Sequence, residues 1–557
     1  MKNIFKKLTC FSLAFLVLGC AGTSKASESS IDETSSSEES TSMPSSIPSS
    51  GSSASTSSGS ETKPYVESIP EIRFKSNVAS EIDFATKATK SDLTRPEVEG
   101  KFTITNCDES FQKTDVVGTM KVRGNQTANW SKKAFRIKFG SKVNLLGLNG
   151  GKKFKKWILL ADAKDTTLVR TALGLYVAKG LVDDGDNVWV SDYTPVNVYL
   201  NDQYWGFYYL AEQKETKEGR VNLPEPAEGY TGTDIGYCFE LDSYAASSES
   251  DVATEQRKGS DGDPTFRMKH LPSHEQGSPS GPLAPTARGL NTYTMLSDIT
   301  DSTAKVGEHT EADYNGDQKV SNSNQLSFIR DRMEKLYQVL YYASKNQAKD
   351  INEAGELVNS TQSVKDALGK HFNLNSWVDG YILNAYTVAP DLGYSSFYMS
   401  FDNTPTGDHK LRFDVPWDFD SNFGNRNNFY VNADGDTYVE KTYNTWLYLL
   451  SKINFFIDMV KVKWNKIRDE KLFEGMFAMM NEHFEKHDGE IKRNHQKWPQ
   501  NDAAHQPPNN FDEIRDPYKD PAQYKDAEAE TISWCAKRVN FLEKKWGKNR
   551  PNVVTNG

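Results

Sequence analysis

Two aspartates flank an expected β-hairpin within residues 376–425, and this segment restricts the fold of the chain more than any other. Residues 394–401 and 410–417 are typical of strands and are joined by a turn-rich stretch. In an antiparallel hairpin the start of the first strand lies beside the end of the second. Asp391 stands just before the first strand and Asp418 just after the second. We therefore expect both side chains at the same open end of the hairpin, within reach of one ligand.

Carboxylates at such a position suit a hard cation and the phosphate oxygens that it binds. Asp420, two residues after Asp418, is a further candidate ligand or a partner of the first. Aspartates also cap turns routinely, and this alternative stays open for each of them. The order helix, Asp391, hairpin, Asp418 is the order of a protein-kinase catalytic centre, where one aspartate receives the substrate hydroxyl proton and the second holds Mg²⁺.

The two halves of the chain after residue 64 differ in expected secondary structure. Short apolar or alternating runs predict strands in the first half, and helical periodicity dominates after residue 326. Residues 244–325 are rich in Ser, Gly, Pro and Asp and predict a polar insertion with little structure. The expected fold class is α+β: an atypical, protein-kinase-like two-lobed fold, with a strand-rich N-terminal lobe over about 65–243 and a mainly helical C-terminal lobe over 326–550. The elements expected in the first half are strands over 119–123, 133–139, 157–161 and 238–241, a helix over 166–179, and a hairpin of 196–200 with 204–210.

Lys133 is the candidate to meet nucleotide phosphates within the strand-rich half. It follows the loop 124–131, which joins two expected strands, and a kinase centre places a basic residue on a strand. A solvated strand lysine is the alternative reading of the same position.

The N-terminus predicts export. Residues 1–19 have a lysine-rich start and a short apolar run, which are the proportions of a signal peptide and too short for a membrane span. Gly19 precedes Cys20, as in a lipoprotein cleavage site, so we expect cleavage before Cys20 and a lipid on that cysteine. An ordinary secretory peptide cut near Ala26 is the alternative. The expected location is extracytoplasmic, with the protein anchored by lipid to the cell membrane.

Residues 20–64, which begin with the lipid-bearing cysteine, are expected to form a disordered, serine-rich tether. They carry too few apolar side chains to offset the entropy of ordering. The net charge of the whole chain is −10, which argues against nucleic acid as a partner, because phosphate binding needs a basic face.

A weak calcium-loop pattern lies inside the polar insertion. Asp313, Asn315 and Asp317 match the first alternating ligand positions of such a loop. Gln318 stands where a glycine normally makes the turn, and a polar surface turn is the alternative.

Several short blocks, in order along the chain, resemble the spore coat protein H (CotH) kinase family. The blocks are Val122-Arg123-Gly124-Asn125, residues 132–139, Leu145-Leu146-Gly147-Leu148, residues 157–170, residues 201–212 and Pro416-Trp417-Asp418-Phe419-Asp420-Ser421-Asn422-Phe423-Gly424. The resemblance implies a kinase fold that uses ATP with Mg²⁺ or Mn²⁺ to phosphorylate serines of a protein substrate, which is expected to be serine-rich.

The resemblance also implies roles for individual residues. Asp391 would be the catalytic carboxylate, Asp418 a metal ligand and Asp420 a further one. Lys133 would pair with phosphate, with Arg123 nearby. Glu212 would either orient a basic partner or hold a metal.

One position departs from the pattern of kinases. Five residues after the catalytic aspartate they place an asparagine that helps to bind metal, and this chain has Ser396 there. The competing hypothesis is therefore a non-catalytic surface module, in which a kinase-like fold serves binding or adhesion. A hydrolase with paired carboxylates is disfavoured, because Asp418 and Asp420 are too close in sequence to flank a scissile bond from opposite faces.

Overall fold

The computed structural model describes residues 69–78, 82–87, 95–124, 126–183, 185–242, 265–268, 292–299, 324–393, 395–425, 432–435, 439, 444–499 and 524–553. The expected signal peptide, Cys20, the tether and the calcium candidates Asp313, Asn315 and Asp317 lie outside these residues. The chain divides into Met1–Pro64 and Tyr65–Gly557, and every element below belongs to the second unit. Over the described ranges, no helix combines the length and apolar character that crossing a membrane requires.

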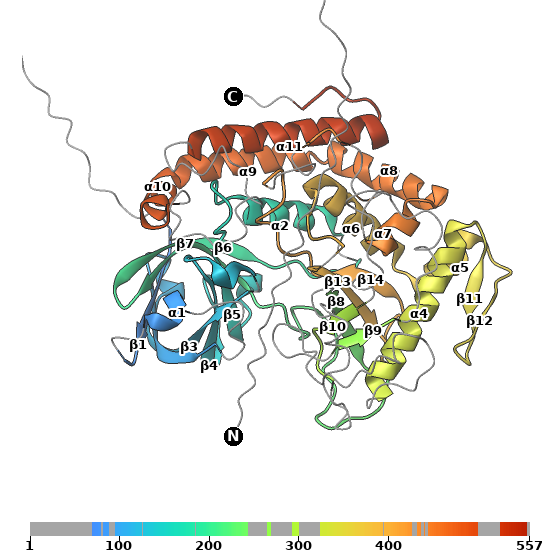
Figure 1. The fold of residues 1–557 in the computed structure, drawn as a ribbon, viewed down its shortest axis with the longest axis horizontal. Coiled ribbons are helices and arrows are strands. Elements are labelled where there is room, and N and C mark those ends of the chain that lie inside the picture. The colour runs from blue at the N-terminus through green and yellow to red at the C-terminus, as the bar shows by residue number, and fades with distance from the viewer. Residues whose placement is uncertain are drawn as a thin grey trace, which may run out of the picture. The chain divides into compact units, whose positions relative to one another are not determined.

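A closed β-barrel forms the N-terminal part of this unit (Figure 1). Its strands follow the order β1-β2-β3-β4-β5-β7-β6, and parallel pairing of β1 with β6 closes the ring. Side chains alternate between the barrel interior and the outside, so that Phe135, Ile137 and Phe139 are buried within it. The barrel elements are β1 (Glu71–Ser76), α1 (Asp83–Lys87), β2 (Glu97–Thr105), β3 (Lys113–Arg123), β4 (Ala134–Val143), β5 (Phe154–Leu160), β6 (Tyr193–Leu200) and β7 (Gln203–Glu212), with short 3₁₀ helices over Glu109–Phe111, Gln126–Asn129 and Asn149–Gly151.

A second sheet carries the hairpin that the sequence predicts. Its strand order is β14-β13-β8-β10-β9, and β13 pairs antiparallel with both β14 and β8. The strands are β8 (Gly236–Leu241), β9 (Thr265–Arg267), β10 (Thr292–Met295), β13 (Phe397–Asp402) and β14 (Leu411–Asp414), and a separate small ribbon pairs β11 (Lys349–Ile351) with β12 (Leu357–Asn359). β9 and β10 fall inside 244–325, so this segment contributes more structure than its composition suggests.

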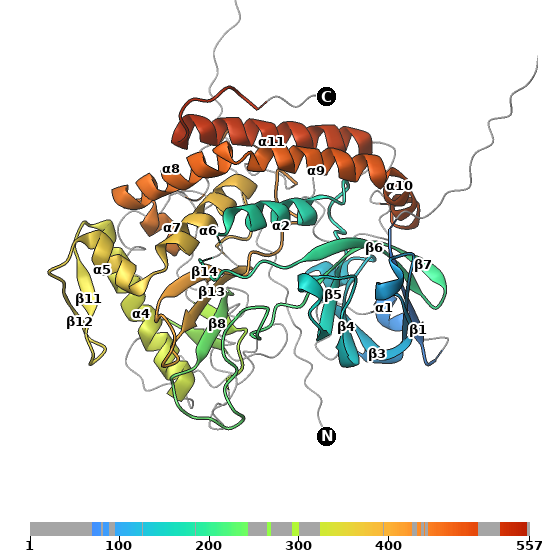
Figure 2. The ribbon, with the colours of Figure 1, turned by 180° about the vertical axis from the view of Figure 1, so that it is seen from behind.

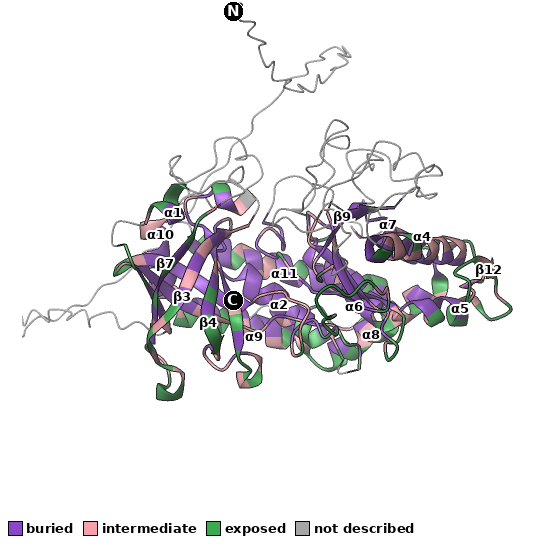
Figure 3. Cartoon of the chain, turned by 90° about the horizontal axis from the view of Figure 1, so that it is seen from below, coloured by how far each residue is buried: buried purple, intermediate pink, exposed green. Residues whose placement is uncertain are grey.

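Helices make up most of the C-terminal part. In Figures 1 and 2, α8, α9 and α11 run along one side, with α2 and α6 next to them and α10 against the barrel strand β7. Figure 3 shows α2 largely buried between these layers, whereas β3 and β4 carry exposed positions. The helices are α2 (Arg170–Leu181), α4 (Asn324–Ser344), α5 (Val364–His371), α6 (Leu374–Thr387), α7 (Thr445–Leu450), α8 (Asn454–Asp469), α9 (Leu472–Lys486), α10 (Asp488–Lys497) and α11 (Tyr524–Trp546).

Strand β7 joins the two parts because it is buried on both faces. Tyr208 and Leu210 belong to the apolar core inside the barrel, while Phe207 and Tyr209 belong to the larger core of the helical part. Tyr209 also donates a hydrogen bond from its hydroxyl to the Leu168 carbonyl over 2.7 Å. Because both faces of β7 are buried, its sequence is a nearly continuous apolar run and not a strict alternation of apolar and polar residues.

The expected fold class α+β is confirmed, with strands in the N-terminal part and helices in the C-terminal part. The helix expected from residue 166 begins only at Arg170, because Asp165 accepts hydrogen bonds from the Val169 and Arg170 amides over 3.0 and 2.8 Å. Helix α6 is capped by Asn373, whose Oδ1 accepts a hydrogen bond from the Ser376 amide.

Candidate active site

The hairpin β13–β14 brings Asp391 and Asp418 to one end. α6 ends at Val388, which adopts φ 52° and turns the chain out of the helix towards Asp391. Asp418 follows β14, and both aspartates line the same pocket. The juxtaposition expected from the hairpin is therefore present, and the chemical roles of the two residues stay predictions.

A second pocket adjoins the first and shares residues 417–419 with it. Arg123, Asp162 and Asp420 line this second pocket. The Arg123 guanidinium lies 5.9 Å from the centre of the Trp417 ring. The second pocket thus combines carboxylates with a guanidinium, the group that best matches phosphate.

Asp420 is buried, and its burial raises its pKa to about 6. The nearby charge of Asp418 raises this pKa further, and the Lys164 ammonium opposes the rise. Lys164 Nζ lies 3.3 Å from Ser421 Oγ, next to Asp420 along the chain. A cation beside Asp420 would favour its ionised form, so the carboxyl suits a ligand role.

Asp162 is a pocket residue that sequence reasoning missed. It follows β5, is 5% exposed, and accepts a hydrogen bond at Oδ1 from Thr171 Oγ1 over 2.6 Å. Its Oδ2 atom is buried and has no hydrogen-bond partner among the described residues. Burial, aided by the charges of Asp165 and Asp420, raises the pKa of Asp162 to about 8. The only sequence signal was its place directly after an apolar strand.

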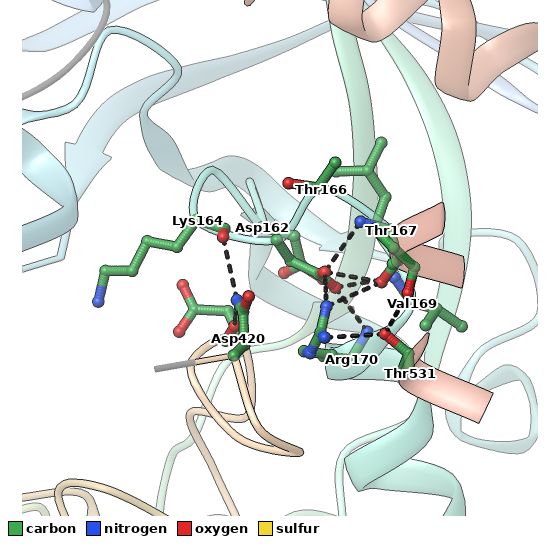
Figure 4. Close-up of polar contacts among 12 residues, drawn as sticks. Asp162, Lys164, Thr166, Thr167, Val169, Arg170, Asp420 and Thr531 are labelled. Carbon is green, nitrogen blue, oxygen red and sulfur yellow. Dashed lines mark hydrogen bonds and ion pairs between the residues drawn. The ribbon is translucent and has the colours of Figure 1, made fainter. Parts of the chain in front are cut away.

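The loop after Asp162 is fixed by a buried ion pair between Asp165 and Arg170. Arg170 also donates a hydrogen bond to Thr531 of α11 over 2.8 Å. Figure 4 shows this bonded group next to Asp162 and Asp420. The pair therefore holds one wall of the second pocket in place and ties it to the last helix.

The two neighbouring lysines before β4 differ in their surroundings. Lys133 Nζ donates hydrogen bonds to the Ala128 and Trp130 carbonyls over 2.7 and 2.8 Å. Lys132 Nζ is buried, has no hydrogen-bond acceptor within the part of the chain that the structure describes, and lies 4.8 Å from the centre of the Tyr208 ring. Neither side chain is among the residues that line the two pockets. Lys133 thus supports the loop whose Thr127 lines the second pocket.

Glu212 lies at the end of β7, away from both pockets. Its Oε2 accepts a hydrogen bond from the Asp192 amide over 2.9 Å, and its Oε1 lies 3.4 Å from Arg220 Nε. Arg220 stacks on the Phe154 ring at 3.9 Å. Of the two roles left open by the sequence, these contacts match the one in which Glu212 orients a basic partner.

Glu240 on β8 is a second residue that sequence reasoning missed. Its Oε1 accepts a hydrogen bond from the Ser396 amide over 2.6 Å, and Ser396 Oγ in turn donates to Asp418 Oδ2 over 3.1 Å. Burial raises the pKa of Glu240 to about 7, and the Lys214 ammonium opposes this rise. Strand neighbours 156 residues apart give no signal in a single sequence.

The described residues contain no group of three or more His, Cys, Asp or Glu side chains arranged to hold a metal ion. Asp418 and Asp420 nevertheless offer hard oxygen donors of the kind that Mg²⁺ and Mn²⁺ prefer.

The protein is an α+β protein in which a strand barrel is joined to a helical part, and aspartates and an arginine line two adjoining pockets. The family model described as CotH kinase protein matches residues 120–267 and 293–525. The chain belongs to the CotH kinase family, which indicates a kinase-like transferase. A comparison with curated proteins found no match.

Proposed function

We propose that this protein is an atypical kinase, tethered to a membrane outside the cytoplasm, that transfers phosphate from ATP to serines of a protein substrate. The observation that carries this proposal is that Asp391 and Asp418 line one pocket, beside a second pocket with Asp420 and Arg123. Membership of the CotH kinase family supports it. A kinase-like two-lobed plan, with the barrel in the N-terminal lobe, is part of the proposal.

In this mechanism Asp391 accepts the proton of the serine hydroxyl as the hydroxyl oxygen attacks the γ-phosphorus. The new bond joins that oxygen to phosphorus, and the bond to the oxygen bridging the β- and γ-phosphates breaks, which leaves ADP. Arg123 stabilises negative charge on the phosphates from the second pocket.

Asp418 and Asp420 would hold Mg²⁺ or Mn²⁺. Such an ion neutralises charge on the phosphate oxygens. Asp418 is exposed and already oriented by the Ser396 hydroxyl, whereas Asp420 is buried behind it. Lys133 contributes by holding the loop beside Arg123, and Glu212 by orienting Arg220.

Radioactive phosphate transfer tests the enzymatic proposal. The full chain, purified in detergent, is incubated with labelled ATP, Mg²⁺ or Mn²⁺ and a serine-rich polypeptide. We expect transfer that Asp391→Asn and Asp418→Asn each reduce by at least about a hundredfold, as for loss of a general base or a metal ligand. Asp402→Asn is the matched control, because Asp402 belongs to the same hairpin and its Oδ1 accepts hydrogen bonds from Thr404 at the turn. Undiminished transfer by Asp418→Asn contradicts the proposal.

Calorimetry separates the enzyme from the alternative, a non-catalytic binding or adhesion module. ATP with Mg²⁺ should bind the wild-type chain, and the absence of detectable binding at millimolar nucleotide favours the module.

Because free ATP is scarce outside a cell, transfer from other nucleoside triphosphates is measured in parallel.

Membrane fractionation tests the anchor independently of the activity. We expect the wild-type chain in the membrane fraction and Cys20→Ala in the soluble extracytoplasmic fraction. A wild-type chain that is recovered soluble, with its N-terminus near Ala26, supports the ordinary secretory peptide.

A further inference from the structure

Glu240 connects the second sheet to the hairpin end where the proposed site lies. It faces Tyr398 across the β8–β13 pair. Its Oε1 accepts a hydrogen bond from the Ser396 amide over 2.6 Å, and its Oε2 accepts one from the Tyr398 hydroxyl over 2.6 Å. Both carboxylate oxygens are therefore engaged by β13 and the residue just before it.

Lys214, just after β7, approaches the same carboxylate at Oε2. Its ammonium lies 3.7 Å from Glu240 Oε2, and it contacts the Tyr398 hydroxyl. It also lies 4.1 Å from the centre of the Tyr398 ring and 5.8 Å from that of Trp417, which lines both pockets. Glu240 thus fixes a cation beside Trp417 as well as the backbone before β13.

Ser396 has a conformation that needs support. Its φ of 58° lies in the left-handed region, which serine adopts rarely. Above the pKa of Glu240, which burial raises to about 7, the hydrogen bond from the Ser396 amide to the carboxylate is a charged one, stronger than a bond between neutral groups. In this conformation Ser396 Oγ donates to Asp418 Oδ2, and Asp418 itself has a φ of 66°. Two residues with unusual backbones thus face each other, and Glu240 holds one of them.

We propose that Glu240 is a positioning residue of the metal and nucleotide site, an inference that rests on the proposed function. Its carboxylate holds Ser396 in the left-handed conformation, and Ser396 in turn fixes the carboxylate of Asp418. Glu240 is not among the residues that line the two pockets, so it acts through Ser396 and not by touching a ligand.

Mn²⁺ binding, followed by electron paramagnetic resonance of the full chain, tests this role without any need for activity. Glu240→Gln keeps the shape of the side chain but removes its charge and replaces one acceptor oxygen with an NH₂ group. We expect its dissociation constant for Mn²⁺ to rise on the order of tenfold, as for loss of one charged hydrogen bond. Glu543→Gln is the matched control: Glu543 is a buried carboxylate, it accepts from Trp464 over 2.9 Å, and it lines neither pocket.

A double-mutant cycle separates positioning from general destabilisation. If Glu240 acts through Ser396, then Glu240→Gln has little further effect on Mn²⁺ affinity in a Ser396→Ala background. Additive effects of the two changes contradict the proposal, and so does a loss of affinity in Glu543→Gln equal to that in Glu240→Gln. Thermal melts establish that each variant is folded at the assay temperature.

The outcomes distinguish this inference from the proposed function. Wild-type Mn²⁺ binding that Asp418→Asn abolishes and Glu240→Gln leaves unchanged overturns the inference alone. Absence of phosphate transfer, with Mn²⁺ affinity still dependent on Glu240, overturns the kinase and retains the positioning role. A wild-type chain that binds no Mn²⁺ overturns both.

Discussion

Ser396 Oγ donates a hydrogen bond to Asp418 Oδ2 over 3.1 Å. The residue that stands in place of the kinase asparagine therefore contacts the candidate metal ligand directly. A hydroxyl can orient a carboxylate in this way, but it offers a cation one weaker oxygen donor than an amide carbonyl. The departure from the kinase pattern thus alters the oxygen donors that this position offers, while Ser396 still contacts Asp418.

Ser396→Asn should strengthen metal binding. Asparagine tolerates a φ of 58° better than serine, and its amide supplies both a donor for Asp418 and a carbonyl oxygen for a cation. We expect the dissociation constant for Mn²⁺ to fall several-fold, with the melting temperature unchanged or slightly higher. The comparison variant is Ser396→Ala, which loses the hydroxyl and should bind more weakly than the wild type. Weaker binding by the asparagine variant than by the alanine variant would refute this account.

The sequence predicts the part of the site that depends on local pairing. Asp391 and Asp418 flank two strands joined by one turn, so the antiparallel pairing rule alone brings them together. Asp162 follows β5 and Glu240 lies on β8, and both reach the site only through the tertiary arrangement. Their positions in a single sequence look like those of any polar residue at or near the end of a strand.

A single sequence also does not show in which direction a side chain points. Lys132 and Lys133 are adjacent, and the pattern of β4 does not tell which ammonium meets a charged group and which meets backbone carbonyls. In the structure, Lys133 is hydrogen-bonded to the loop before β4, whereas Lys132 is buried near Asp162 and Asp165. This difference depends on η2, the 3₁₀ helix over Gln126–Asn129, which periodicity does not predict.

Lys133→Met and Lys132→Met should therefore differ in stability. Lys133→Met leaves the Ala128 and Trp130 carbonyls without their donor, which costs about 2–6 kcal/mol at roughly 1–3 kcal/mol for each buried unpaired group. Lys132 has no acceptor to lose, and burial lowers its pKa to about 7, so its removal should cost less than about 1.5 kcal/mol. Urea denaturation followed by circular dichroism measures both. Equal costs would show that the two ammonium groups have equivalent surroundings.

Asp165→Asn should be among the more destabilising single changes. Asp165 is fully buried, pairs with Arg170 and accepts the Val169 and Arg170 amides that begin α2. Breaking one partner of a buried ion pair costs about 3–5 kcal/mol. Denaturant unfolding at pH 7.5 tests this. The matched control is Asp83→Asn, which removes an exposed pair with Lys87 and should cost less than about 0.5 kcal/mol.

Mild acid should loosen the contact between the helical part and the loop at the site. His483 and His495 are buried on α9 and α10, and burial lowers their pKa values to about 3 and about 4. His495 Nε2 lies 2.8 Å from the Thr166 carbonyl, in the loop that carries Asp165. In the unfolded chain both histidines titrate near their ordinary pKa of about 6.5, so the unfolded state binds more protons as the pH falls. Their contribution to stability is therefore complete above pH 7 and is lost progressively below about pH 6.5, down to about pH 4 for His495 and about pH 3 for His483.

Unfolding free energies at pH 7.5 and pH 5.0 measure this loss, which we expect to be about 1–2 kcal/mol for each histidine. His495→Gln keeps a donor for the Thr166 carbonyl and removes the titration, so its stability should fall less steeply with pH than that of the wild type. His409→Gln is the matched control, because His409 lies in the exposed turn between β13 and β14. A pH slope that is the same in His495→Gln as in the wild type would mean that the pKa of His495 does not differ between the folded and unfolded states, and it would contradict this account.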